Sequence, residues 1–143
     1  MTNILEYQMP NVGCLIGSVY QLQLSGLSTA LADAGLDIIP SEYLVLRSLY
    51  SHDGMQQCDV AALLGKDKAG VSRCVGAMER KGLVRTEIVS HKCRRVWLTD
   101  RGWELEPVLL KIAGERHKAL KQLVGDKDME TFVKVLKLIL TQK

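Results

Sequence analysis

The sequence predicts a mainly α-helical protein of 143 residues whose helices are interrupted once by a β-hairpin. Three observations support this fold class. Apolar residues recur at intervals of three and four along most of the chain, which is helical spacing. Glycine or proline stands at the ends of these periodic segments. After Gly82 the pattern changes to short runs of β-forming residues, which is typical of paired strands.

A glycine is predicted to end the first helix and to separate it from the second. The first long helix runs from Val12 to Ala34, and Gly35 ends it. The second begins at Pro40, because proline is tolerated in the first turn of a helix, and the sequence His52-Asp53-Gly54 closes it. The apolar face expected for the second helix consists of Tyr43, Leu46, Leu49 and Tyr50.

A short helix and a longer one follow, separated by a tight turn. The short helix spans Gln57 to Leu64 and stops at Gly65, and Asp67 is the predicted N-cap of the longer helix, which runs to Lys81. The buried stripe expected for the longer helix is Val71, Cys74, Val75 and Met78. Its polar outer face makes the pair a helix-turn-helix.

The hairpin is predicted to have strands at 83–89 and 95–98, joined by the basic tip 90–94. Thr99 then caps a further helix, in which Pro107 should cause a bend or a break. Asp126 begins the last helix, whose apolar stripe is Met129, Phe132, Val133, Leu136, Ile139 and Leu140.

Positive charge is concentrated in the middle of the chain. The whole chain has a net charge of +3, but the segment from Lys66 to Arg101 holds ten basic and four acidic residues, a net charge of +6. The remainder is therefore acidic, with a net charge of −3. Such a basic block indicates a surface for phosphates, although by charge alone a solvated, salt-bridged face explains it equally well.

In a helix-turn-helix, the N-terminal residues of the second helix meet base edges in the DNA major groove. Arg73 is expected to pair with guanine, Ser72 with a base or a phosphate, and Ala69 with a thymine methyl group. Lys66 and Lys68 are expected to hold phosphates and set the register. The hairpin would lay its tip along the neighbouring backbone or minor groove. The candidate residues at the tip are His91, Lys92, Arg94 and Arg95.

Four sequence segments, in their order and spacing, resemble the MarR family of bacterial regulators, and the resemblance extends over essentially the whole chain. They are 41–46 (Ser-Glu-Tyr-Leu-Val-Leu), 63–73 (Leu-Leu-Gly-Lys-Asp-Lys-Ala-Gly-Val-Ser-Arg), 78–85 (Met-Glu-Arg-Lys-Gly-Leu-Val-Arg) and 98–102 (Leu-Thr-Asp-Arg-Gly). The resemblance implies a single winged helix-turn-helix domain, 1–143, with a two-stranded wing. Residues 37–101 would form the DNA-binding core, and 1–36 with 102–143 the helical dimerisation region.

The same resemblance implies a homodimer that binds a pseudo-palindromic double-stranded operator. Members of the family usually repress a nearby gene, and they release the DNA when a small aromatic or anionic effector binds or an oxidant reacts, so the same behaviour is expected here. One departure concerns the wing, where the family usually has an Asp-x-Arg motif. This chain has Ser90-His91-Lys92 there, so the charge is kept but the planar guanidinium is lost. Recognition of the shape of the DNA minor groove by the wing would then be weaker, or Arg94 or Arg95 would provide it.

The four cysteines are Cys14, Cys58, Cys74 and Cys93, and their wide spacing is typical of reduced thiols in a cytosolic protein. Cys14 lies roughly where the peroxide-sensing members of the family keep a reactive thiol. Two interpretations of Cys14 stay open, a redox-active thiol and a small apolar residue packed between subunits, and the second is favoured because no basic neighbour adjoins it. The three histidines share no metal-ligand spacing, so no metal is expected.

Other function classes find little support. The sequence holds no enzyme motif, so no catalytic residue and no cofactor are expected. No signal peptide is recognised between Met1 and Gln21, and no apolar run is long enough to span a membrane, which favours the cytoplasm. The main alternative is a winged helix that binds a protein, which would need an apolar or acidic outer face on the helix 68–80. RNA binding is a lesser alternative, because aromatic residues are only 5% of the chain.

Overall fold

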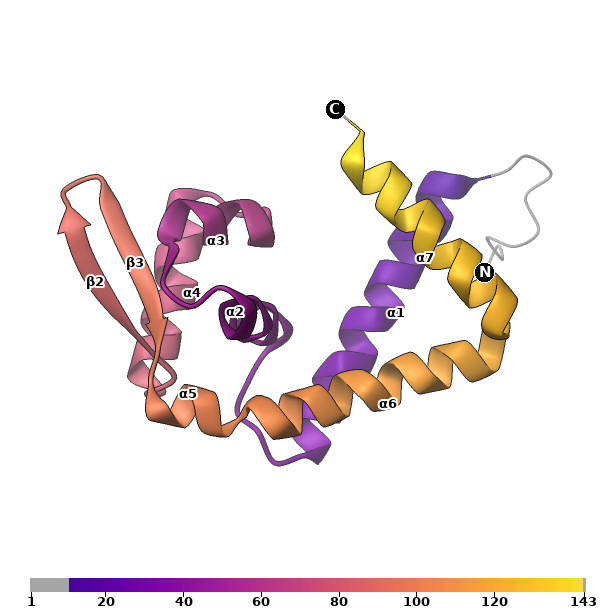
Figure 1. Cartoon of the computed structure of the whole chain (residues 1–143), viewed down its shortest axis with the longest axis horizontal. Coiled ribbons are helices and arrows are strands. Elements are labelled where there is room, and N and C mark those ends of the chain that lie inside the picture. Colours follow the sequence, from indigo (N-terminus) through magenta and orange to yellow (C-terminus); the bar gives the residue numbers. More distant parts are fainter. Residues whose placement is uncertain (1–10, 143) are drawn as a thin grey trace. The chain divides into compact units, whose positions relative to one another are not determined.

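The computed structural model describes residues 11–142, and the predicted features that fall on residues 1–10 lie outside this range. The described chain divides into two compact units, which meet between Glu104 and Leu105, and Figure 1 shows the helices and strands of both. The first unit contains α1 (Val12–Asp33), α2 (Pro40–Ser51), β1 (Met55–Gln56), α3 (Gln57–Leu64), α4 (Lys68–Arg80), β2 (Val84–Ser90), β3 (Cys93–Leu98) and α5 (Asp100–Glu104). The second contains α6 (Glu106–Val124) and α7 (Asp126–Thr141).

The mainly α-helical fold class and the predicted order of helices and hairpin are confirmed. The break expected at Pro107 also occurs. Helix α5 ends at Glu104, and α6 begins at Glu106 with Pro107 in its first turn. Proline fits there because the first turn of a helix has no hydrogen-bond acceptor for the missing N–H. The residues between Thr99 and Val124 therefore form two helices in place of one.

The sheet has three antiparallel strands in the order β1-β3-β2, one more than the sequence predicted. Strand β1 is only two residues long, and it pairs with β3 through Met55↔Val96 and Gln56↔Arg95. The hairpin tip is also shorter than predicted. Strands β2 and β3 extend to Ser90 and Cys93, which pair with each other, so only two residues form the turn. The register shifts by one residue between Ile88 and Ser90.

The core of the first unit forms where α2, α3 and α4 pack against the base of the hairpin. The stripe predicted for α4 is confirmed, because all four of its residues are buried. Buried with them are Val45, Leu46 and Leu49 of α2, Val60 of α3, and Leu83, Val84, Val96 and Leu98 at the base of the hairpin. This packing fixes α4 and the hairpin relative to each other.

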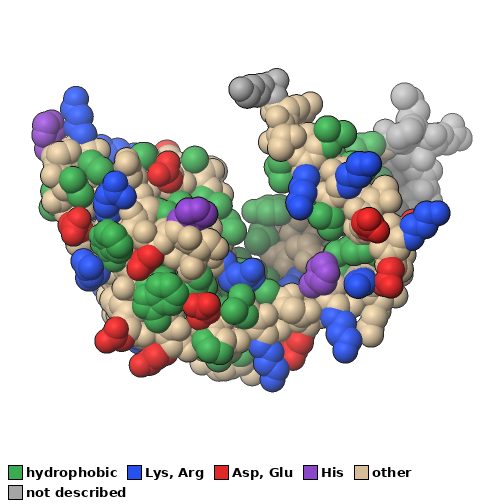
Figure 2. Space-filling view, viewed as in Figure 1, with side chains coloured by type: hydrophobic (Ala, Val, Ile, Leu, Met, Phe, Trp, Pro, Cys, Tyr) green, Lys and Arg blue, Asp and Glu red, His purple; other side chains and the backbone are tan. Residues whose placement is uncertain are grey.

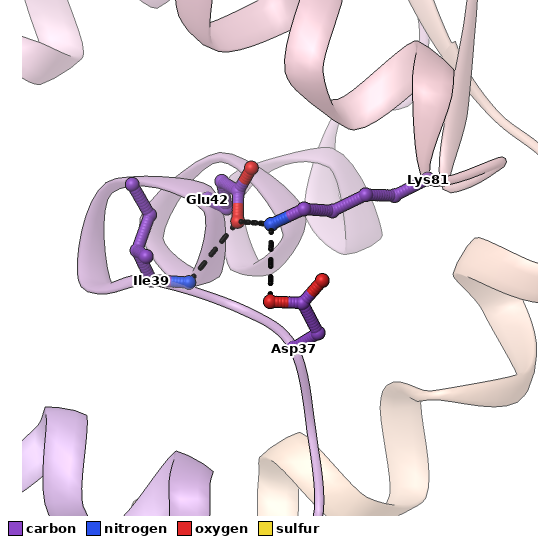
Figure 3. A network of polar contacts seen from close by, with 4 residues as sticks. All are labelled: Asp37, Ile39, Glu42 and Lys81. Carbon is purple, nitrogen blue, oxygen red and sulfur yellow. Dashed lines mark hydrogen bonds and ion pairs between the residues drawn. The ribbon is translucent and has the colours of Figure 1, made fainter.

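One acidic residue is buried in this unit, which the sequence did not predict. The side chain of Glu42 is only 1% exposed, and its Oε1 lies 2.7 Å from Nζ of Lys81. The same oxygen accepts a hydrogen bond from the backbone N–H of Ile39 at 3.0 Å. Nζ of Lys81 also lies 3.8 Å from Oδ1 of the exposed Asp37 (Figure 3). These contacts join the start of α2 to the end of α4.

The base of the wing is tied to the turn after α2. The carboxylate of Asp53 accepts hydrogen bonds from the backbone N–H groups of Gly54 and Leu98. The Nη1 atom of Arg95 donates to the carbonyl oxygen of Gly54 at 2.8 Å. The ring of Trp97 lies against Gly54, between the wing and the turn after α2. The wing is thus anchored at its base and free at its tip.

The terminal helices expose apolar surface. Helix α1 is mostly exposed, and its exposed large apolar residues are Val12, Leu15, Ile16, Val19, Tyr20 and Leu22. In the second unit, α7 buries Met129 but exposes Phe132, Val135, Leu136, Leu138, Ile139 and Leu140. Four of these residues belong to the apolar stripe predicted for the last helix, namely Phe132, Leu136, Ile139 and Leu140. Within the described residues, the apolar faces of α1 and α7 are therefore only partly covered by other side chains.

Candidate nucleic-acid interface

A short turn positions α4 against α3. Helix α3 ends at Gly65, whose φ of 61° lies in the left-handed region where glycine is favoured. The side chain of Asp67 then accepts a hydrogen bond from the backbone N–H of Gly70 at 2.7 Å, so Asp67 is the N-cap that the sequence predicted. The turn between the two helices is therefore fixed at both ends by residues with specific backbone preferences.

The outer face of α4 carries four of the predicted site residues. Lys68, Ala69, Ser72 and Arg73 are all exposed, on the side of α4 opposite its buried stripe. Lys66, in the turn before α4, is exposed as well. The predicted recognition surface is thus accessible along the first turns of the helix.

A groove lies between the wing and the start of α4. We call it the wing groove, and its volume is about 740 Å³. It brings together residues more than fifteen positions apart in sequence, Lys68 and Ser72 of α4 with the wing residues. The residues that line it are Gln56, Gln57, Cys58, Ala61, Lys68, Val71, Ser72, Ile88, Ser90, His91, Lys92, Cys93 and Arg94. Three of the four predicted wing residues therefore share one surface with the recognition helix.

The opposite flank of α4 has a second hollow, of about 460 Å³. Lys66 and Arg73 lie here, beside Ile39, Ser41 and Glu42 from the start of α2. The predicted recognition residues are therefore divided between two flanks of one helix. Lys68 and Ser72 face the wing side, and Lys66 and Arg73 face the α2 side.

Two predicted residues lie elsewhere. Arg95 is half-buried and donates to the carbonyl oxygen of Gly54, so its guanidinium is directed at the body of the protein and does not line the wing groove. Cys14 is exposed on α1 and lines neither hollow. Of the two arginines that the sequence offered as substitutes for the missing wing arginine, only Arg94 lines the groove.

Five cations of the described chain, near the start of α4 and at the wing tip, are not paired with carboxylates. Within residues 11–142, Lys66, Lys68, Arg73, Lys92 and Arg94 form no ion pair with an acidic side chain. Figure 2 shows basic and histidine side chains at the tip of the hairpin. These five residues do not form the salt bridges of the alternative explanation, although their exposure is also what a solvated face predicts. They are free to attract phosphates.

Sequence reasoning missed the contribution of two residues in the first turn of α3. Gln57 lines the wing groove, and its Nε2 donates to Oγ of Ser72 at 3.4 Å, which links α3 to the outer face of α4. Cys58 lines the same groove. Their position in the sequence could have indicated this role. They lie in the first turn of the helix before the recognition helix, and the two helices of a helix-turn-helix pack against each other.

Burial distinguishes Cys74 from the other thiols. It lies on the inner face of α4, and burial raises the pKa of its thiol, partly offset by a hydrogen bond with Ser41. The packing role that the sequence predicted for Cys74 agrees with this position. Residues 11–142 contain no cluster of three or more metal-ligating side chains. No helix in this part of the chain has the length and apolar character needed to cross a membrane.

Comparison with known proteins adds to this geometry. A family model described as MarR family matches residues 36–93. Transcriptional regulator HosA of Escherichia coli O157:H7 is 25% identical over 103 residues, which cover 71% of this chain and 76% of HosA.

Two solved structures share the fold. The S. aureus MepR–DNA complex matches with a TM-score of 0.80 and 22% identity, covering 93% of this chain and 98% of MepR. The repressor CouR, bound to p-coumaroyl-CoA, matches with a TM-score of 0.78 and 21% identity, covering 92% of this chain and 93% of CouR. At these identities, the two likenesses establish the fold.

Proposed function

We propose that this chain, whose residues 36–93 match the MarR family model, is a transcriptional regulator of that family and works in the cytoplasm as a homodimeric repressor of a pseudo-palindromic operator. Helix α4 enters the major groove, and the wing tip lies along the adjacent backbone or minor groove. The observation that carries this proposal is the wing groove, where unpaired cations of α4 and of the wing meet on one exposed surface.

The division of α4 into two flanks suggests a division of roles. The planar guanidinium of Arg73 can donate two hydrogen bonds to guanine. Within the described chain it forms no ion pair that would compete with DNA for these donors. Lys68 and Lys92 are point charges on the two sides of the wing groove, which suits phosphates. Ser72 is held by Gln57, so its hydroxyl reaches DNA in an orientation that α3 sets.

A second copy of the chain is the partner that fits the exposed apolar surface. Leu138 and Leu140 of α7 are 70% and 82% exposed, and Ile16 of α1 is 53% exposed. Contiguous exposed apolar patches on soluble proteins mark interaction sites. In a dimer, the two recognition helices would address half-sites about one DNA turn, roughly 34 Å, apart.

Release by a small-molecule effector belongs to the same proposal. CouR, which has this fold, is a repressor bound to p-coumaroyl-CoA in its solved structure. A ligand that binds the DNA-free conformation better than the DNA-bound one shifts the population towards release. Screening small aromatic acids and acyl thioesters for loss of DNA binding would test this part separately.

A salt titration tests the proposal as a whole. The full chain is mixed with random-sequence duplex DNA at several salt concentrations, and its mass in solution is measured alongside. We expect a dimer whose affinity falls steeply as salt rises, because each phosphate contact releases counterions. A dimer without affinity for DNA even at low salt would contradict the proposal and favour the protein-binding alternative.

Arg73→Ala is expected to weaken binding to an operator selected from random duplexes by about 1–3 kcal/mol. The physical reason is the loss of a bidentate contact to one base, so preference at a single base position should relax as well. Binding curves on the operator and on random duplex measure both effects. An equal loss on the two DNAs would show that Arg73 does not read a base.

Lys92→Ala is expected to weaken binding to operator and random duplex alike, and to reduce the slope of log affinity against log salt by about one. A phosphate contact carries no sequence information, so the loss should be even. Lys127→Ala removes an exposed lysine of α7 that lines neither hollow, and it serves as the matched control. If both lysine variants changed the slope equally, the wing would have no special part in binding.

A further inference from the structure

Gln57 lies at the junction between strand β1 and helix α3. Strand β1 ends at Gln56, which pairs with Arg95 of β3, and Gln57 is the first residue of α3. The backbone of Gln57 is therefore held next to the base of the wing. Its side chain lines the wing groove together with residues from the outer face of α4. The wing base, α3 and the outer face of α4 thus meet at Gln57.

The side-chain amide of Gln57 has one buried end and one end directed at α4. Its Oε1 is buried and has no hydrogen-bond partner within residues 11–142. Its Nε2 donates to Oγ of the exposed Ser72 at 3.4 Å. The reverse orientation would bury two N–H donors without partners, and orphaned N–H groups are rarer than under-satisfied carbonyl oxygens. Burial therefore favours the orientation in which Gln57 donates and Ser72 accepts.

This hydrogen bond limits what the hydroxyl group of Ser72 can do. A serine Oγ carries one O–H donor and two acceptor lone pairs. The N–H of Gln57 occupies one lone pair, and an N–H offers no acceptor to the O–H of Ser72. The O–H is therefore left to donate away from α3. Because Ser72 is exposed, this donor is available on the surface proposed to contact DNA.

The residues around Ser72 favour a base as its partner over a phosphate. Lys68 lies one turn before Ser72, and both line the wing groove. Lys92 and Arg94 line the wing side of the same groove. These long cationic side chains suit phosphates. The short hydroxyl group of Ser72 reaches only atoms close to the helix surface, and the first turns of the second helix of a helix-turn-helix meet base edges.

We propose that Gln57 is a positioning residue that makes Ser72 a hydrogen-bond donor to a keto oxygen in the major groove, O6 of guanine or O4 of thymine. The proposal rests on the proposed function, because it assumes that α4 lies in the major groove. It adds the class of base that Ser72 selects. Guanine and thymine present keto oxygens in the major groove, whereas adenine and cytosine present amino groups.

A transition is the base change that tests which partner donates. Guanine to adenine exchanges the O6 oxygen for the N6 amino group, and thymine to cytosine exchanges the O4 oxygen for the N4 amino group. Either change places a donor opposite the O–H of Ser72. One neutral hydrogen bond is then lost, so affinity should fall about fivefold for a transition in one half-site.

The test measures binding of the full chain to an operator selected from random duplexes and to every single transition of that operator. Ser72→Ala identifies the base pair, because the preference of the unaltered protein should disappear there. Gln57→Glu replaces the donor by an acceptor, so the O–H of Ser72 turns to the carboxylate and only a lone pair remains for DNA. The preference at the same base pair should reverse, with the amino base bound about fivefold more tightly than the keto base.

Two control variants separate the direction of the hydrogen bond from charge and size. Gln56→Glu adds the same charge to the wing groove, but Oε1 of Gln56 accepts from Cys58 and not from Ser72. It should lower affinity for all duplexes, as Gln57→Glu also does, and leave the base preference unchanged. Gln57→Met keeps a side chain of similar length without an N–H donor. It should weaken the preference at that base pair without reversing it.

The hydrogen bond itself can be observed without DNA. The side-chain amide of Gln57 gives an NMR signal that Gln57→Glu removes, and Ser72→Ala should shift this signal in the DNA-free protein. An unshifted signal would overturn the proposal. An equal loss of affinity on every duplex in Ser72→Ala, or an unchanged base preference in Gln57→Glu, would also overturn it. If the unaltered protein bound no DNA, the proposed function would fail, and the amide signal would still decide whether Gln57 holds Ser72.

Discussion

Lys81→Met is expected to lower the free energy of unfolding by about 3 kcal/mol. The carboxylate of Glu42 is 1% exposed and lies 2.7 Å from Nζ of Lys81. Without the ammonium group it would remain buried with the Ile39 N–H as its hydrogen-bond donor. An uncompensated buried charge is among the costliest defects in a folded protein. Urea denaturation of the variant and the unaltered protein at neutral pH measures the difference.

Two further variants isolate the buried pair. Asp37→Asn removes the second carboxylate near Lys81, which lies 3.8 Å away and is 95% exposed, so it should cost less than about 0.5 kcal/mol. Glu42→Leu combined with Lys81→Met removes both charges and should recover much of the stability that the single variant loses. Equal losses from Lys81→Met and Asp37→Asn would show that burial of Glu42 does not control the effect.

Gly54→Ala is expected to destabilise the protein by about 3 kcal/mol through two separate effects. The φ of Gly54 is +79°, in the left-handed region, where a side chain costs roughly 1–2 kcal/mol. In addition, a Cβ atom at Gly54 would lie 2.5 Å from the ring of Trp97, and relieving such crowding in a packed site costs about 1–3 kcal/mol. Thermal unfolding followed by circular dichroism measures the sum.

Gly35→Ala separates the two effects. Gly35 has nearly the same φ, +75°, but nothing lies within 4 Å of the place where its Cβ would be. It should therefore lose only the backbone contribution, about 1 kcal/mol. If the two glycine variants melted at the same temperature, the contact with Trp97 would contribute nothing to stability.

Much of the fold was predictable because its signals are local. Glycine in the left-handed region ends α3 at Gly65, and the side chain of Asp67 caps α4. The three-and-four spacing of apolar residues predicted the whole buried stripe of α4. Strand β1 was not predictable in this way, because two residues are too few to show alternation. The burial of Glu42 depends on Lys81, 39 positions away, and no local pattern records that.

The candidate site was predicted in composition but not in arrangement. Helical periodicity is enough to place Lys68, Ser72 and Arg73 on the outer face of α4. It does not say which flank each residue shares with its neighbours, because that depends on how the wing and α2 pack. The wing assignment of Arg95 shows the same limit. Its guanidinium binds the carbonyl oxygen of Gly54, which is 41 positions away in sequence. The roles of these residues towards DNA stay predictions.

The pairing of β1 with β3 has a consequence for the order in which the molecule assembles. Strands β2 and β3 are joined by a two-residue turn, so the hairpin can form within about 1–10 μs. Pairing Met55 with Val96 instead requires closure of a long loop that contains α3 and α4, and this closure carries an entropic cost that grows with loop length. We expect the hairpin to exist transiently before it is anchored, and its docking onto the turn after α2 to be a late step that completes the DNA-binding surface.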